Sequence, residues 1–261
     1  MPTQPIRKPA PFLNPQHVAD FARDGFVYLP GAFSVGEMRR ITQWTDEVQG
    51  WKEEPGRHMA YYEDSLTEPG KRVLQRIENF VPYHPGFQDL LSDPRMLGAV
   101  EQLFGGASVL FKEKINFKLP GGDGFKPHQD QQAGWWNYAP IFITALVTID
   151  EQTLQNGCLE LAAGHHKKGL VGGEWTPLTD KDMADMNFVP YPTKAGDVMF
   201  FDSFAPHGSK PNQTDKPRRV LYITYNKLAD GDHRVPYYAD KRKSFPPDIE
   251  RLPGQQYKFR V

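Results

Sequence analysis

The segment Val109–Asp130 has the sequence VLFKEKINFKLPGGDGFKPHQD, and it joins a strand pattern to two residues that can bind a metal. Apolar and polar side chains alternate through its first half, as they do in a strand whose two faces differ. The turn Pro120–Gly122 closes this strand, and His128-Gln129-Asp130 follows. In extended chain, side chains two residues apart point to the same side. The imidazole of His128 and the carboxylate of Asp130 can therefore reach one cation.

Further strand patterns follow this segment, and helical patterns precede it. The chain has 23 glycines and 24 prolines among 261 residues, which favours many short elements joined by turns. Helices first and strands later predict an α+β protein that is mostly β, with its sheet core beginning at about residue 106. Helices are expected from Asn14-Pro15, from the capping-box pair Ser34 and Glu37, and over 85–104; strands over 26–29, 73–80, 109–119, 141–149, 158–162, 196–201 and 220–225; and a loop over 51–69.

No linker divides the chain, so we expect one domain over residues 1–261. Its expected parts are a helical support at about 14–104, the strand core at about 106–230 and a C-terminal extension at 231–261.

The composition excludes several classes of protein. Thirty-one Lys and Arg residues against 32 Asp and Glu leave a net charge of −1, so no overall basic field attracts nucleic acid or an anionic membrane. A single cysteine, Cys158, excludes a disulfide framework. No apolar run is long enough to span a bilayer, and Met1–Pro11 is too polar and proline-rich for a secretory signal. We therefore expect a cytoplasmic protein with a small-molecule substrate; the oligomeric state cannot be inferred.

A third metal ligand is available in His207, which follows the apolar strand predicted at 196–201. Two histidines and one carboxylate on one face of a metal leave coordination positions open, the arrangement of non-haem Fe(II) oxygenases. A lone His-x-Asp is most often a surface turn or a hydrogen-bonded histidine. The metal site is predicted because His128-Gln129-Asp130 and His207 each follow a predicted strand. His165 and His166 are alternative ligands, although a loop beside the sheet explains them better.

Arg218 lies eleven residues beyond His207, at the entry of a predicted strand. A planar guanidinium binds a carboxylate through two hydrogen bonds, so Arg218 can anchor the far carboxylate of a 2-oxo acid that chelates the metal. The hydroxyl of Ser209 can donate another hydrogen bond. Alternatively, Arg218 and Arg219 are a solvated basic pair; of two adjacent strand residues only one can face inward.

These motifs resemble the phytanoyl-CoA dioxygenase-like family of Fe(II)/2-oxoglutarate-dependent oxygenases. The matching residues are His128, Asp130, His207, Ser209 and Arg218, together with the segment Leu154–His166, in which Ala163-Gly164-His165-His166 departs from the family's Pro-Gly-Ser-His loop. The resemblance extends over Lys112–Lys227. It implies a double-stranded β-helix, or jelly roll, supported by N-terminal helices. It also implies Fe(II) held by the three ligands, 2-oxoglutarate anchored by Arg218 and Ser209, and O2 as the second co-substrate.

Other polar side chains are candidates for binding the co-substrate or the substrate. Lys114 and Asn116 lie on the polar face of the first strand, which is either a solvated edge or a wall of the site. The resemblance places the family's active-site strand here, which favours Lys114 for 2-oxoglutarate and Asn116 for the substrate. Thr144 can hydrogen-bond the tail of 2-oxoglutarate, and Gln129, between two ligands, is a further substrate candidate.

Aromatic and basic residues suggest what the substrate is like. Trp135 and Trp136 follow the metal motif and either cover the core or line the substrate mouth with Tyr61, where rings attract an ammonium group. Arg76 can bind an anionic group. Such a set suits a zwitterion, and the segments around Tyr61 and Arg76 resemble the family branch that hydroxylates aminoalkylphosphonates.

The predicted function is the hydroxylation of an unactivated C–H bond in a small molecule, such as an aminoalkylphosphonate or a betaine-like compound. Two alternatives remain at this point. A jelly-roll hydrolase or isomerase using zinc or manganese would need no 2-oxo acid, which leaves Arg218 and Ser209 unexplained. A catalytically silent family member would bind only a small ligand or a partner.

Overall fold

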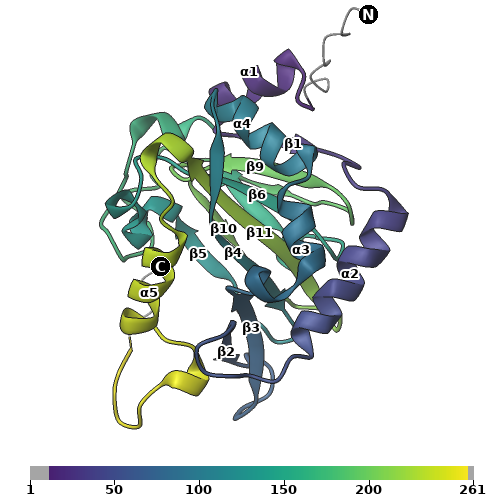
Figure 1. Cartoon of the computed structure of the whole chain (residues 1–261). Helices are drawn as coiled ribbons and strands as arrows, with labels where there is room; N and C mark the ends of the chain where they lie inside the picture. The colour runs from purple at the N-terminus through teal and green to yellow at the C-terminus, as the bar shows by residue number, and fades with distance from the viewer. Residues whose placement is uncertain (1–11, 258–261) are drawn as a thin grey trace, which may run out of the picture.

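Two antiparallel sheets form the centre of the computed structural model, which describes residues 12–257 (Figure 1). The larger sheet has the order β1 (Phe26–Leu29), β9 (Val198–Asp202), β6 (Ile143–Thr148), β11 (Arg218–Lys227), β4 (Ser108–Lys118), β3 (Arg72–Glu78) and β2 (Met59–Asp64). The smaller sheet has the order β5 (Phe125–His128), β10 (His207–Ser209), β7 (Leu159–Ala162) and β8 (Phe188–Tyr191).

Alternation along the central strands divides the core into two layers. On β6, Leu146 packs toward the smaller sheet with Leu161, whereas its neighbour Ala145 belongs to the opposite, helix-covered layer. Phe201 and Phe200 on β9 divide in the same way. Period-two alternation is what a sheet buried on both faces requires. On these strands, one residue of each successive pair faces the smaller sheet and the other faces the helices. This alternation builds the two core layers of the jelly-roll sandwich.

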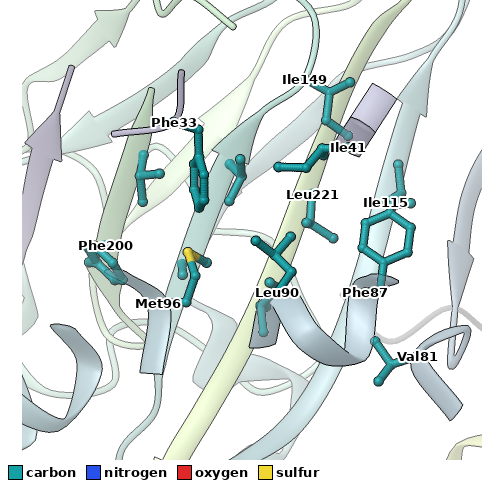
Figure 2. Packing of buried hydrophobic residues seen from close by; sticks show 14 of the residues in the cluster. Phe33, Ile41, Val81, Phe87, Leu90, Met96, Ile115, Ile149, Phe200 and Leu221 are labelled. Atoms are coloured by element: carbon teal, nitrogen blue, oxygen red, sulfur yellow. The ribbon is translucent and has the colours of Figure 1, made fainter. Parts of the chain in front are cut away.

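The helices cover the face of the larger sheet that points away from the smaller one (Figure 1). Figure 2 shows Ile41 and Phe87 packed beside Ile115 and Leu221 of the sheet. Full burial of each such side chain contributes about 1.5–3 kcal/mol to the free energy of folding, relative to leaving it exposed. The helices are α1 (Pro15–Asp24), α2 (Val35–Gln49), α3 (Pro85–Leu91) and α4 (Ala99–Phe104), with the short π-helical segment Pro94–Gly98 before α4.

Both predicted helix starts are confirmed by their caps. The Asn14 side chain accepts a hydrogen bond from the backbone N–H of His17 at 2.9 Å, and Ser34 and Glu37 form the reciprocal capping box of α2. Gly25 ends α1 with φ +86°, a left-handed conformation that favours glycine.

The loop predicted over 51–69 is wrong in part, because β2 occupies Met59–Asp64. Met59, Ala60 and Tyr61 are buried in succession, since one face of β2 meets the helix-covered core and the other packs beneath the C-terminal helix α5 (Arg234–Ser244). A strand covered on both faces loses the alternation that identifies a strand in a sequence.

Within residues 12–257, no helix combines the length and the apolar character needed to cross a membrane. The segment Met1–Pro11, on which the cytoplasmic prediction rests, lies outside the described residues.

Candidate metal centre and adjoining cavity

The three predicted metal ligands meet at one point between the sheets. One donor atom from each of His128, Asp130 and His207 lies within 4.8 Å of the other two. The Nε2 atoms of both histidines are 3.9 Å from Asp130 Oδ1. The side chains are only 7–12% exposed. This is a facial set of two imidazoles and one carboxylate.

Strand pairing brings the two histidines together. His128 ends β5 and His207 begins β10, and the two residues are direct partners in the antiparallel ladder, with ring centroids 4.3 Å apart. Each Nδ1 bonds a backbone carbonyl, that of Lys126 at 2.7 Å and that of Ala205 at 2.9 Å. A carbonyl can only accept, so Nδ1 carries the proton and the Nε2 lone pair is left for a metal.

The electrostatics favour a cation at this point. Burial, reinforced by His207, lowers the pKa of His128 to about 3, and burial likewise lowers the pKa of His207. Burial would raise the pKa of Asp130, but His207 and Lys114 outweigh it and the pKa falls. Two neutral imidazoles and one carboxylate are the protonation states that metal binding needs. The set fits a divalent metal ion.

Arg218 faces inward and is fully buried, whereas its neighbour Arg219 turns outward and bonds Asp150 at 2.8 Å. The Nη2 of Arg218 bonds Gln152, but among the described residues its Nε and Nη1 have no hydrogen-bond partner. Burial lowers the pKa of this guanidinium. A buried guanidinium with unsatisfied donors is costly unless an anion completes it. The site therefore fits a ligand carboxylate, and the alternative of two solvated arginines is wrong.

Lys118 is a second buried basic side chain beside Arg218, and the sequence alone assigns it no role. Its Nζ donates to Ser209 Oγ at 2.7 Å and to the carbonyl oxygens of Gly157 and Lys210. Burial, together with nearby Arg218, lowers the pKa of Lys118 to about 6. Because Ser209 accepts from Lys118, its own hydroxyl proton is left to donate to a ligand.

The polar face of β4 is a wall of the site, so the reading of a solvated edge is wrong. β4 lies between β11 and β3, and Lys112, Asn116 and Lys118 are all buried. Lys114 and Asn116 line a small hollow at the triad together with Thr144. Burial, and then Lys112, lowers the pKa of Lys114 to about 8. The alternation of polar and apolar residues, interrupted by Glu113, predicts the strand. It does not show that a neighbouring strand covers each edge of β4.

Thr144 lies beside the metal ligands. Its hydroxyl is 2.9 Å from Thr224 Oγ1 and 3.5 Å from Asp130 Oδ2.

A larger cavity of about 260 Å³ adjoins the hollow at the triad. Lys114, Phe125, Asp130 and Trp135 line both spaces, so a ligand in the cavity lies next to the metal centre. Trp135 is buried there, but Trp136 is 54% exposed and bonds Glu174. Of the two predicted tryptophans, only Trp135 lines the cavity, because successive residues of this turn point in different directions.

Arg76 lines the cavity, whereas two other predicted substrate residues do not. Tyr61 lies behind it, with the Arg76 guanidinium 4.4 Å from the centre of its ring, and donates its hydroxyl to Phe245 O at 2.9 Å. Gln129 is fully buried, and its amide bonds the backbone of Gly169, Val171 and Phe204. Its side chain holds the loops around the site and leaves no group for a substrate.

Several cavity residues were not predicted as site residues at all. They come from segments whose approach depends on the tertiary fold: Glu78, Lys112, Trp175, Tyr237, Asp240 and Lys241.

A family model for phytanoyl-CoA dioxygenase (PhyH) matches residues 21–220. The chain belongs to the phytanoyl-CoA dioxygenase family. Within it, the chain is 40% identical over 235 residues to a 2-aminoethylphosphonate dioxygenase of an uncultured bacterium (HF130_AEPn_1), covering 90% of this chain and 89% of that protein. It is 37% identical over 236 residues to a methylphosphonate hydroxylase of Gimesia maris, covering 90% and 88%. The predicted family and the predicted dioxygenase class are confirmed.

Solved structures confirm the jelly-roll fold. EctD from S. alaskensis, crystallised with 2-oxoglutarate and 5-hydroxyectoine, has a TM-score of 0.71 at 22% identity over 84% of this chain and 77% of that one. The epimerase SnoN, in complex with Fe3+, alpha ketoglutarate and nogalamycin RO, has a TM-score of 0.69 at 21% identity over 94% and 92%.

Proposed function

We propose that this dioxygenase uses Fe(II), 2-oxoglutarate and O2 to hydroxylate a C–H bond of a small organophosphonate. The observation that carries the proposal is the His128–Asp130–His207 triad opening onto a cavity with buried cations in its wall. The names of the two relatives at 37–40% identity point to the same substrate class.

The metal would be held by His128, Asp130 and His207, whose donor atoms converge. When bound, iron and 2-oxoglutarate supply an oxidant for an unactivated C–H bond, with one atom of O2 entering the product and the other entering succinate as CO2 leaves. The backbone carbonyls behind both imidazoles keep each ring in one tautomer and orientation, so both Nε2 atoms would be available to the metal.

2-Oxoglutarate would place its far carboxylate against Arg218 and Ser209. Arg218 offers buried donors without partners, and Lys118, at the same end, would gain a positive charge when a carboxylate beside it raises its pKa from about 6. Lys114 and Thr144, which line the hollow at the triad, are positioned for the rest of this co-substrate. Asn116, also in that hollow, is proposed to contact the substrate or the co-substrate there.

The substrate would occupy the 260 Å³ cavity beside Asp130. Phe125 and Trp135 line both this space and the hollow at the triad, where their rings would keep water from the reacting carbon. Aromatic side chains of Trp135, Tyr138 and Tyr237 line the same cavity and suit an ammonium group by cation–π attraction.

Neither alternative accounts for the buried arginine. A hydrolase or isomerase would leave the unpartnered donors of Arg218 without an anion, and a silent family member would have no need for an intact triad.

The test is succinate release from 2-oxoglutarate by the Fe(II)-loaded enzyme, screened with 2-aminoethylphosphonate, methylphosphonate and glycine betaine. We expect stimulation by at least one phosphonate, and none in the His128→Ala variant. Equal succinate release with and without every phosphonate, alongside stimulation by betaine, would assign a different substrate class. A phosphonate product formed without 2-oxoglutarate would overturn the co-substrate.

A further inference from the structure

A buried carboxylate in the cavity wall is surrounded by three cations. Glu78 is 1% exposed; Lys241 Nζ lies 2.6 Å and Arg76 Nε 2.7 Å from its carboxylate oxygens, and Lys112 Nζ lies 3.8 Å away. These four residues all line the 260 Å³ cavity. Burial would raise the pKa of Glu78, but Lys112 and Lys241 outweigh it, so the pKa falls and the carboxylate is ionised.

The cluster has an excess of positive charge. Glu78 lies between the ammonium groups of Lys112 and Lys241, and one carboxylate balances only one of these two positive charges. Asp240 lines the same cavity, but its side chain is 59% exposed and accepts a hydrogen bond from Tyr138 at 2.9 Å. Uncompensated buried charge is costly, and burial lowers the pKa of Lys241 accordingly. An anion in the cavity would remove this cost.

The geometry suits an anion with several oxygens. Lysine and arginine donate in several directions, and Glu78 uses only part of the hydrogen-bonding capacity of Lys241 and Lys112. Lys112 also lies 5.2 Å and 5.3 Å from the ring centres of Trp135 and Tyr237, which fixes its head group at the cavity. A phosphonate has three oxygens to share among such donors, and a carboxylate has two.

Lys241 comes from a part of the chain that the family model does not match. The match ends at residue 220, and α5 begins at Arg234. α5 is fastened to β4 by Arg234 and Tyr238, which both bond the buried Glu113. Part of the cavity wall thus comes from a helix outside the matched region.

We propose that Lys241, with Lys112 and Arg76, binds the phosphonate group of the substrate, and that α5 is the element that selects this anion. Glu78 is a positioning residue that holds the three cations together. The inference rests on the proposed function for the identity of the ligand, but the anion site itself is a feature of the cavity.

The test compares Lys241→Met with Lys243→Met, a change of an exposed lysine on the same helix that does not line the cavity. The full-length enzyme, loaded with Fe(II) and 2-oxoglutarate without O2, is titrated calorimetrically with 2-aminoethylphosphonate. Loss of one charge-assisted hydrogen bond predicts about 10- to 100-fold weaker binding for Lys241→Met. Lys243→Met should bind as the wild type does.

Two further readouts separate recognition from folding. 2-Oxoglutarate affinity should be unchanged in Lys241→Met, and Lys241→Arg, which keeps the charge, should recover much of the phosphonate affinity. Unchanged phosphonate affinity in Lys241→Met would overturn the proposal, as would an equal loss of affinity for both ligands. If the wild type binds the phosphonate tightly but never oxidises it, the proposed function fails and the anion site stands.

Discussion

The metal end and the cationic end of the site are built in contrasting ways. The metal end takes its histidines from two paired strands, His128 from β5 and His207 opposite it on β10, and its carboxylate from Asp130, two residues beyond His128 at the start of a 3-10 turn. The cationic end joins β3, β4 and α5, and its bond between Glu78 and Lys241 spans 163 residues. The metal end depends on short spacings and one strand pair, whereas the cationic end depends on how three distant segments pack.

Removing a triad ligand tests the metal end most severely. His128→Ala or Asp130→Ala should lose stoichiometric iron and reduce succinate release to background, because two remaining ligands do not complete the facial set. Iron content and succinate assays check this. His165→Ala is the matched control, since His165 lies in the turn 165–168 and outside the triad. Normal iron content in His128→Ala would break the assignment of the ligands.

Removing the ion pair between Arg234 and Glu113, which holds α5 to β4, tests the cationic end through the free energy of unfolding. Arg234→Ala leaves the fully buried Glu113 without its cation and should cost about 3–5 kcal/mol of the free energy of unfolding. Arg57→Ala, which removes an exposed pair with Glu54, should cost about 0–1 kcal/mol. Urea unfolding of the two variants measures the difference. Equal losses would show that α5 is not held by this ion pair.

Arg218 offers a second test of the metal end, because the adjacent Arg219 points outward and serves as its matched control. Arg218→Met should raise the KM for 2-oxoglutarate by roughly 100-fold, since a bidentate charged contact is lost. Arg219→Met, whose side chain turns outward to Asp150, should leave this KM unchanged. Steady-state kinetics at saturating phosphonate distinguish the two. Equal effects would mean that the basic pair acts only on the fold.

These comparisons show how much of the molecule the sequence could predict. The triad, Arg218 and most strands can be predicted from short spacings and from alternating apolar and polar residues. Such patterns are visible in the sequence alone. The approach of α5 and the burial of β2 have no local signal, because Met59, Ala60 and Tyr61 lack alternation and Lys241 lies in a charged stretch. Trp136 and Gln129 lie next to the metal motif in the sequence but do not line the cavity, because proximity to a motif does not determine which way a side chain points. The extent of the single domain stays a prediction.

The smallest expected effect is a pH dependence at the co-substrate end. Burial holds the pKa of Lys118 at about 6 in the absence of a ligand, and a carboxylate beside it would raise that pKa. The protonated form binds better, so 2-oxoglutarate affinity should fall as the pH rises above about 6, with uptake of up to about one proton on binding near pH 7. Calorimetry in buffers of different ionisation enthalpy measures this uptake.

Lys118→Met should remove the pH dependence of 2-oxoglutarate binding. Identical proton uptake in the variant and the wild type would assign it to another group.

The most direct test of the account is the origin of the oxygen in the product. The Fe(II)-loaded enzyme is given 2-aminoethylphosphonate, 2-oxoglutarate and 18O2, and product and succinate are examined by mass spectrometry. The account predicts a hydroxylated phosphonate carrying one 18O, formed in equal amount with succinate carrying the other. A product whose new oxygen comes from water, or succinate formed with the phosphonate unchanged, would contradict it.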